Sequence, residues 1–144
     1  MQMICEEHEI LDKNIQNLNL GLKRWMESTD FQLWKIEFIW QMREFKRDLY
    51  RHFELEDDSA FFDFYPVRES KKGVFGLHIR REHAKLIITF EKIFSRLKKI
   101  KNAADPKLSK LETDLKQFIS DIQEHESKER KVLSELSNRS ESGA

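Results

Sequence analysis

Two histidine–glutamate pairs with the same spacing fall on apolar helical patterns in this chain. His52 and Glu56 lie four residues apart, and His125 and Glu129 repeat that spacing. Residues at i and i+4 share one face of an α-helix, so each pair points in one direction. A carboxylate in a helical core is costly unless a cation or proton pairs with it. The two pairs therefore predict a metal site inside the protein.

Two further histidines occupy core positions of apolar patterns of their own. His8 is followed at helical spacing by Leu11, and His83 is followed by Leu86. Either histidine–glutamate pair, taken singly, would be equally consistent with a hydrogen-bonded polar pair in the core. Four histidines on four separate apolar faces favour a shared metal centre instead. The predicted metal ligands are His8, His52, Glu56, His83, His125 and Glu129.

These residues must be positioned by long helices, because the apolar patterns are helical almost throughout. The patterns predict helices over residues 3–27, 31–60, 78–102 and from Asp105-Pro106 to about residue 137. Ser28-Thr29-Asp30 and Asp105-Pro106 supply residues that favour helix starts. The longest predicted break is 61–77, which contains Pro66, Gly73 and Gly76. Residues 1–137 form one predicted domain, and 138–144 a disordered tail.

Four helices with short first and last connections predict an all-α, up-down-up-down antiparallel four-helix bundle. Each of the four histidines lies roughly 21–23 residues from the nearer short turn, near residue 29 or 104. At about 1.5 Å per residue, each is roughly 31–35 Å from that turn. Equal distances in antiparallel hairpins mean equal depth, so the ligands are predicted to meet at one level near one end of the bundle.

The ligands also repeat along the chain, because each half offers two histidines and one glutamate. Two related halves suit two ions, with two imidazoles for each ion and with Glu56 and Glu129 as bridges. Imidazole and carboxylate ligands predict two non-haem iron ions, with manganese or zinc as substitutes. Ion binding should compete with protons on the histidines.

The overall charge gives no reason to expect a nucleic-acid or membrane partner. The 144 residues include 26 basic and 26 acidic side chains, so the formal net charge is zero. No apolar run is long enough to span a membrane, no signal peptide is visible, and a single Cys suits a reducing compartment. We therefore expect a cytoplasmic protein that is a monomer or a weak homo-oligomer.

The order His-x-x-x-Glu resembles the hemerythrin-like family, the HHE cation-binding domains. The matching segments are EEHEIL (6–11), HFELE (52–56), REHAKL (81–86) and HESKE (125–129). This resemblance implies a non-haem di-iron four-helix bundle. Ferritin-like di-iron proteins instead use Glu-x-x-His, and no Glu lies three residues before any of the five histidines.

The chain differs from the oxygen-carrying members of this family at two places. Those members place another histidine four residues before the one that matches His83, where this chain has Ile79. They also carry His-x-x-x-x-Asp in the last helix, where this chain has His125 and Glu129. Four histidines and two glutamates look more like the di-iron domain of repair-of-iron-centres proteins.

Three functions are open from the sequence. The first is a di-iron protein that binds, senses or reduces O2, NO or peroxide, or handles iron under oxidative or nitrosative stress. The second is a reversible oxygen carrier, which needs His78 as a fifth histidine, turned inward by a π-bulge. The third is a metal-free helical interaction module.

Other residues near the predicted site have simpler interpretations beside the functional one. Cys5 lies three residues before His8 and is expected as a small buried residue rather than a site residue. A separate hypothesis is an apolar lid over the metal end. It would consist of Phe61, Phe62, Phe64 and Tyr65.

Overall fold

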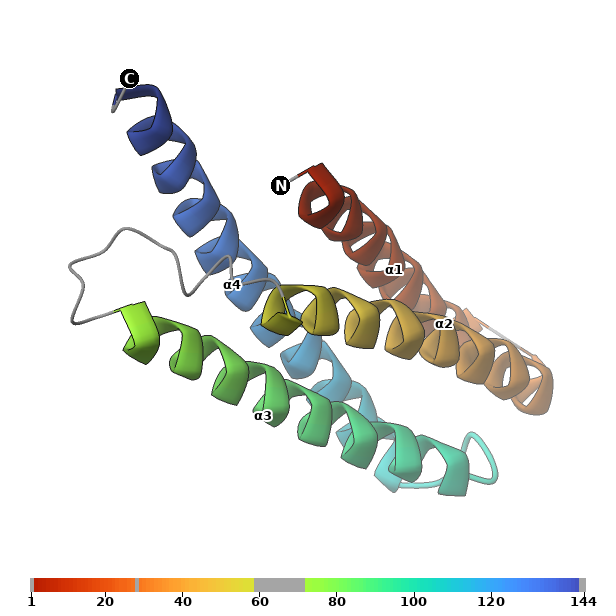
Figure 1. Cartoon of the computed structure of the whole chain (residues 1–144). Coiled ribbons are helices and arrows are strands. Elements are labelled where there is room, and N and C mark those ends of the chain that lie inside the picture. Colours follow the sequence, from red (N-terminus) through yellow and green to blue (C-terminus); the bar gives the residue numbers. More distant parts are fainter. Residues whose placement is uncertain (1, 28, 59–71, 143–144) are drawn as a thin grey trace.

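A computed structural model shows four helices in one bundle (Figure 1). It describes the backbone of residues 2–27, 29–58 and 72–142, and the side chains of 9–24, 29–57 and 79–131. The helices are α1 (Gln2–Glu27), α2 (Phe31–Asp58), α3 (Lys72–Lys99) and α4 (Lys107–Ser142). The predicted all-α fold class is confirmed.

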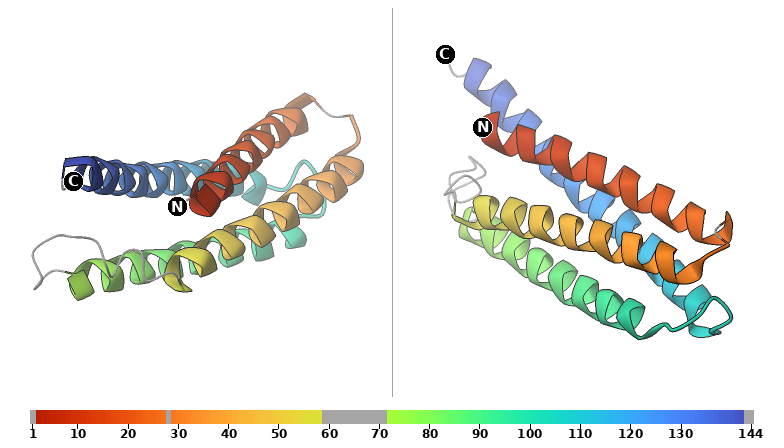
Figure 2. Two further views of the ribbon diagram at one scale, coloured as in Figure 1. Left: turned by 45° about the horizontal axis from the view of Figure 1, so that its top comes forward. Right: turned by 90° about the vertical axis from the view of Figure 1, so that its right-hand side faces the viewer.

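Successive helices run in opposite directions, as an up-down-up-down bundle requires (Figures 1 and 2). The helices form a closed ring of contacts, in which each packs against two others: α1 with α2, α2 with α3, α3 with α4, and α4 with α1. In Figure 1, α4 runs obliquely behind α2 and α3. The beginning of α1, the end of α2, the beginning of α3 and the end of α4 therefore share one end of the bundle.

Aspartates begin the second and fourth helices, as the sequence predicts. The backbone N–H of Leu33 donates to Asp30 Oδ1 over 3.1 Å, and that of Lys107 donates to Asp105 Oδ1 over 2.9 Å. Each carboxylate satisfies a backbone donor that has no partner within the helix. These contacts fix where α2 and α4 start, and hence the depth of the residues that follow.

Two helix boundaries differ from the sequence-based expectation. Helix α3 begins at Lys72, six residues earlier than expected, so Gly73 and Gly76 lie in its first turns. Glycine costs only about 1 kcal/mol in a helix, too little to define an end by itself. Helix α4 continues to Ser142, and residues 138–142 are helical rather than a disordered tail. No proline or glycine interrupts those five residues.

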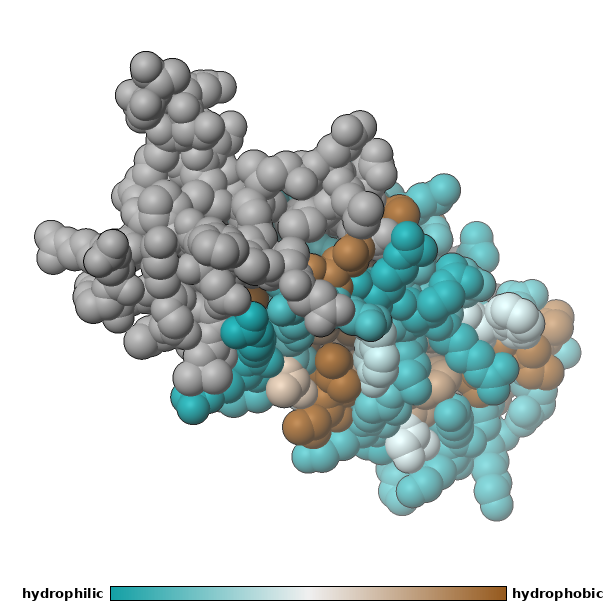
Figure 3. Space-filling view, in the orientation of Figure 1, coloured by the Kyte–Doolittle hydropathy of each residue, from teal (hydrophilic) through white to brown (hydrophobic). Residues whose placement is uncertain are grey.

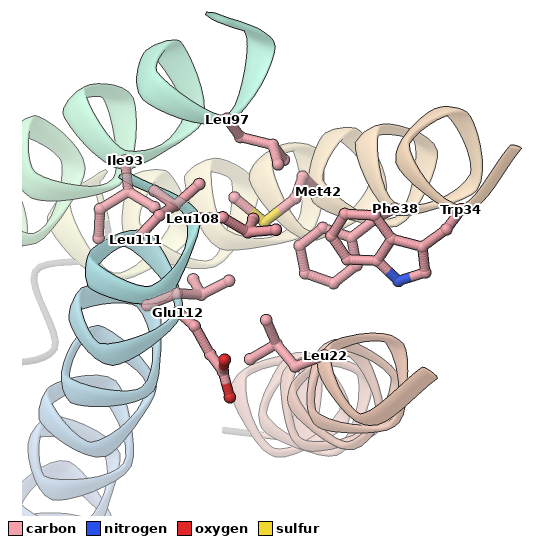
Figure 4. Close-up of a pocket in the computed structure, with 10 residues that line it drawn as sticks. Leu22, Trp34, Phe38, Met42, Ile93, Leu97, Leu108, Leu111 and Glu112 are labelled. Carbon is pink, nitrogen blue, oxygen red and sulfur yellow. The ribbon is translucent and has the colours of Figure 1, made fainter. Parts of the chain in front are cut away.

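The end of the bundle with the short turns is filled by apolar side chains from all four helices. Figure 4 shows a narrow gap there, with Leu22 of α1, Met42 of α2, Leu97 of α3 and Leu111 of α4 around it. Further along the axis, the rings of Phe45, Phe90 and Phe118 pack together in the buried core. This core joins all four helices through apolar side chains.

The residues coloured by hydropathy in Figure 3 are mainly hydrophilic, with hydrophobic side chains between the polar ones. Among the described helices, none is apolar over a stretch long enough to cross a membrane. Charged pairs such as Arg96 with Asp114 (2.7 Å) are partly exposed to solvent, where they contribute little to stability.

Candidate metal centre

The apolar core ends at a layer of buried histidine and glutamate side chains. His52 and Glu56 come from α2, His83 from α3, and His125 and Glu129 from α4, and each is at most 1% exposed. These are five of the six predicted ligands. The sixth, His8, lies on α1, but its side chain is outside the described residues. The depth argument therefore correctly brings the five described residues together.

One group of possible ligands consists of Glu56, His83, His125 and Glu129, each offering an atom within 4.8 Å of the others. The Nε2 atoms of His83 and His125 are 3.0 Å apart, and His83 Nε2 lies 3.1 Å from Glu129 Oε1. Two ligands at right angles around an ion about 2.1 Å away are separated by about 3.0 Å. The two separations measured from His83 match this spacing, whereas His125 Nε2 and Glu129 Oε1 lie closer together.

A second group consists of His52, Glu56, Glu126 and Glu129, again within 4.8 Å of one another. His52 Nε2 lies 2.7 Å from Glu56 Oε1, 3.1 Å from Glu126 Oε1 and 3.6 Å from Glu129 Oε2. This group contains one imidazole and three carboxylates, and Glu126 is only 2% exposed. The buried layer thus offers two adjacent positions where a metal ion could be held.

Glu56 and Glu129 belong to both groups. The two oxygens of Glu129 face different groups, since Oε1 lies 3.1 Å from His83 Nε2 and Oε2 lies 3.6 Å from His52 Nε2. Glu56 Oε1 lies 2.7 Å from His52 Nε2 and 3.8 Å from His83 Nε2. Both glutamates are placed as bridges between two ions would be, and that role stays a prediction.

The outer nitrogens of two histidines are held by carboxylates. His83 Nδ1 lies 2.9 Å from Asp57 Oδ1, and His125 Nδ1 lies 2.7 Å from Glu82 Oε1. Because a carboxylate accepts hydrogen bonds, each Nδ1 is the protonated nitrogen and donates. This leaves each Nε2 lone pair directed into the cluster, as in carboxylate–histidine–metal arrangements. Phe53 stacks on the His83 ring at a centroid separation of 3.9 Å and keeps it in this orientation.

Two inward lone pairs 3.0 Å apart repel each other unless a cation or proton lies between them. Without metal, raised pKa values favour protons in this cluster. Burial opposes the charged form of His52, but hydrogen bonds to Glu126, Glu129 and Glu56 outweigh it and raise its pKa to about 12. Burial and the adjacent Glu129 raise the pKa of Glu56 to about 10. Although burial opposes it, Glu129 and Glu82 raise the pKa of His125.

Sequence reasoning missed Glu126 and the two outer carboxylates, Asp57 and Glu82. A signal for Glu126 was present, because Ile119 and Ile122 are buried and lie seven and four residues before it. The buried face of α4 is wide enough to include this second row of residues. Asp57 and Glu82 had no such signal, because both sit at the edge of their helices' buried faces.

The other sequence-based hypotheses about this end fall on residues outside the description. The side chains of Cys5 and His78 are not among those described, and the proposed lid residues Phe61, Phe62, Phe64 and Tyr65 lie within 59–71. The fifth-histidine and lid hypotheses therefore stay predictions.

No protein-family model matches the chain, and neither a curated protein nor a solved structure matches it. The resemblance to hemerythrin-like domains therefore stays a prediction that depends on the four matching segments. The buried histidine and glutamate cluster is a finding of the structure itself, and its composition and spacing could hold metal ions.

Proposed function

We propose that the chain is a hemerythrin-like, non-haem di-iron protein. In this proposal it binds, senses or reduces O2, NO or peroxide, or handles iron under oxidative or nitrosative stress. The observation that carries the proposal is the orientation of His83 and His125. Their Nδ1 atoms are held outside by Asp57 and Glu82, while their Nε2 atoms converge 3.0 Å apart.

Iron is supported by the mixture of ligands. Imidazoles and carboxylates together suit non-haem iron, and manganese or zinc could occupy the same groups. When bound, iron would supply one-electron chemistry toward small oxidants. The protein's part would be to fix the imidazoles, provide negative charge through Glu56 and Glu129, and keep the centre away from bulk water. Burial of every described ligand to 1% exposure or less favours small, neutral ligands over large substrates.

The direct test is the metal content of freshly purified protein, followed by its optical spectrum after reduction and after exposure to air. We expect about two irons per chain and charge-transfer absorption that changes with redox state. If the protein contained two zinc or manganese ions and no iron, the proposed metal centre would stand, but its assignment to iron would be refuted. If the spectrum of the reduced protein returns when oxygen is removed after exposure to air, the result would support the oxygen-carrier function instead.

Substitution of one ligand distinguishes the metal-centre proposal from the hypothesis of a metal-free interaction module. His52→Ala should weaken metal binding strongly, and a charged residue that cannot ligate should not restore it. A metal-free module would contain no iron, and the His52→Ala variant would keep its stability in the presence and absence of added metal. That result would refute the proposal.

A further inference from the structure

We propose that Glu126 is a metal ligand at one of the two positions, so that the two ions occupy unequal donor sets. This inference depends on the proposed function, since it requires that the cluster binds two ions. It adds a residue that neither the His-x-x-x-Glu pairs nor the lone histidines indicate. It also predicts that the two ion positions differ in metal affinity, which two positions with identical ligands would not do.

The contacts of Glu126 place it at the His52 position. Its Oε1 atom is 3.1 Å from His52 Nε2, and it belongs with His52, Glu56 and Glu129 to the group within 4.8 Å. It does not belong to the group that contains His83 and His125. The described side chains thus give the first position two imidazoles and two carboxylates, and the second one imidazole and three carboxylates.

The chain's internal repeat makes this asymmetry specific. Phe53 follows His52 and Glu126 follows His125, so the two occupy equivalent places in the two halves. Each reaches across to a histidine of the other half: Phe53 stacks on His83, whereas Glu126 contacts His52. At this pair of related places, one half provides an apolar ring and the other a carboxylate.

Three buried carboxyl groups, those of Glu56, Glu126 and Glu129, lie around one imidazole in the His52 group. Carboxylates brought together in a buried site repel one another strongly. A divalent cation removes this repulsion because it accepts several carboxylate oxygens at once.

With Glu126, the His52 position has one more carboxylate than the His83–His125 position, with or without His8, so the two positions should differ in metal preference. Oxygen-rich sites favour hard ions, and imidazole-rich sites favour borderline first-row ions. A borderline ion should therefore fill the His83–His125 position first and the His52–Glu126 position second. Two binding steps would follow from the difference in ligands.

The test is a titration of metal-free protein with Co2+, monitored by calorimetry and visible absorption. Wild type should show two steps. Glu126→Gln should weaken the second step at least about tenfold and leave the first unchanged. The matched control is Glu124→Gln, two residues away on the same helix with a side chain 70% exposed, which should change neither step.

The direction of the change distinguishes a ligand from a simple partner of protonated His52. A carboxylate that only pairs with protonated His52 favours a proton that competes with the metal, so its loss should leave the second step unchanged or strengthen it, whereas loss of a ligand weakens that step. An unchanged or stronger second step in Glu126→Gln would overturn the proposal. Equal weakening of both steps would overturn its assignment to one position.

Diffraction from crystals of cobalt-loaded wild type gives an answer that does not depend on a variant. Anomalous peaks should place one cobalt about 2.1 Å from a Glu126 oxygen. Two cobalt peaks with neither bound by Glu126 would refute this inference and leave the proposed function intact. Failure of the wild-type protein to bind any metal would refute both.

Discussion

Asp57 and Glu82 decide which nitrogen of each imidazole faces the cluster. They are 35% and 23% exposed at their side chains, whereas the histidines that they hold are 1% exposed. Their carboxylates thus lie where the buried site meets solvent. Losing one would free a ring to change tautomer or orientation, which links a partly exposed residue to metal affinity.

We expect Asp57→Asn and Glu82→Gln to reduce metal affinity about 10- to 100-fold each, because the outer hydrogen bond orients the ligand. The helices should persist, since neither residue belongs to the apolar core. Competition with a coloured chelator measures the affinity. Glu54→Gln, an exposed change on the same helix as Asp57, is the control. Unchanged affinity in both variants would mean that these carboxylates do not position the ligands.

Stability of the metal-free protein should fall as pH rises between about 7 and 9. The pKa values of Glu56 and His52 are raised to about 10 and about 12 in the folded protein, so it keeps protons that the unfolded chain releases above pH 4.5 and 6.5. Each group then contributes a loss of up to about 1.4 kcal/mol per pH unit. Urea unfolding at several pH values measures this slope.

The stability that bound metal adds should instead rise with pH. Ions displace the protons of the cluster, so metal affinity and the stability added by metal should rise with pH over the same range. Glu56→Gln removes one titrating group and should flatten the slope of the metal-free protein. A stability independent of pH from 7 to 9 would contradict the proton-loaded cluster.

At the scale of the helices, α1 and α2 approach closely at Gly21. A Cβ atom there would lie 2.7 Å from Phe38 Cδ1, and the Gly21 carbonyl accepts the Trp34 Nε1–H bond over 2.8 Å. Phe38 is buried and stacked on Trp34, so it has little room to move. The glycine therefore serves packing between helices rather than a turn.

Gly21→Ala should reduce the free energy of unfolding by about 1–2 kcal/mol. Overpacking typically costs about 1–3 kcal/mol, and the better helix propensity of alanine returns only part of that. Denaturant unfolding measures the change. Asn17→Ala, one turn earlier on an exposed position of α1, should be neutral or slightly stabilising. A more stable Gly21→Ala variant would show that α1 and α2 can separate at this point.

The sequence predicted the helices and most of the site because both depend on the same periodicity. An apolar stripe identifies the buried face, and His52 or His125 on that stripe is buried with it. Start signals such as Asp30 and Asp105 are local, so they could be located correctly. Equal distances from two short turns then fixed the common depth of the ligands.

What the sequence missed depends on contacts between helices. Glu126 faces inward because α4 crosses the bundle obliquely and buries a second row of residues beside the first (Figure 1). Asp57 and Glu82 gain their roles only from histidines 26 and 43 residues away. Helix α3 starts early because two glycines are insufficient to stop a helix whose later turns are well packed.

At the scale of the whole molecule, the two ends of the bundle should respond differently to loss of metal. None of the described side chains at the apolar end belongs to a ligand group, whereas the opposite end concentrates buried carboxylates and imidazoles. At a free ion concentration 1,000 times its Kd, one bound ion stabilises the fold by about 4 kcal/mol. Chelation should therefore lower Tm by on the order of 10 °C.

Thermal unfolding with and without a chelator measures this loss, and circular dichroism at room temperature follows the helices. We expect most helical signal to survive chelation, because the apolar core remains. The same Tm in both conditions would contradict tight metal binding. Collapse of the helical signal at room temperature would instead show that the core cannot hold the fold alone.

Neither ligand group lies within a single helical hairpin. Each one takes side chains from α2, in the first hairpin, and from α4, in the second. An ion can consequently bind with all its ligands only after the two hairpins have docked, and it then links them across their interface. Metal uptake during refolding should thus lag behind helix formation, and a loaded chain should come apart more slowly than an empty one.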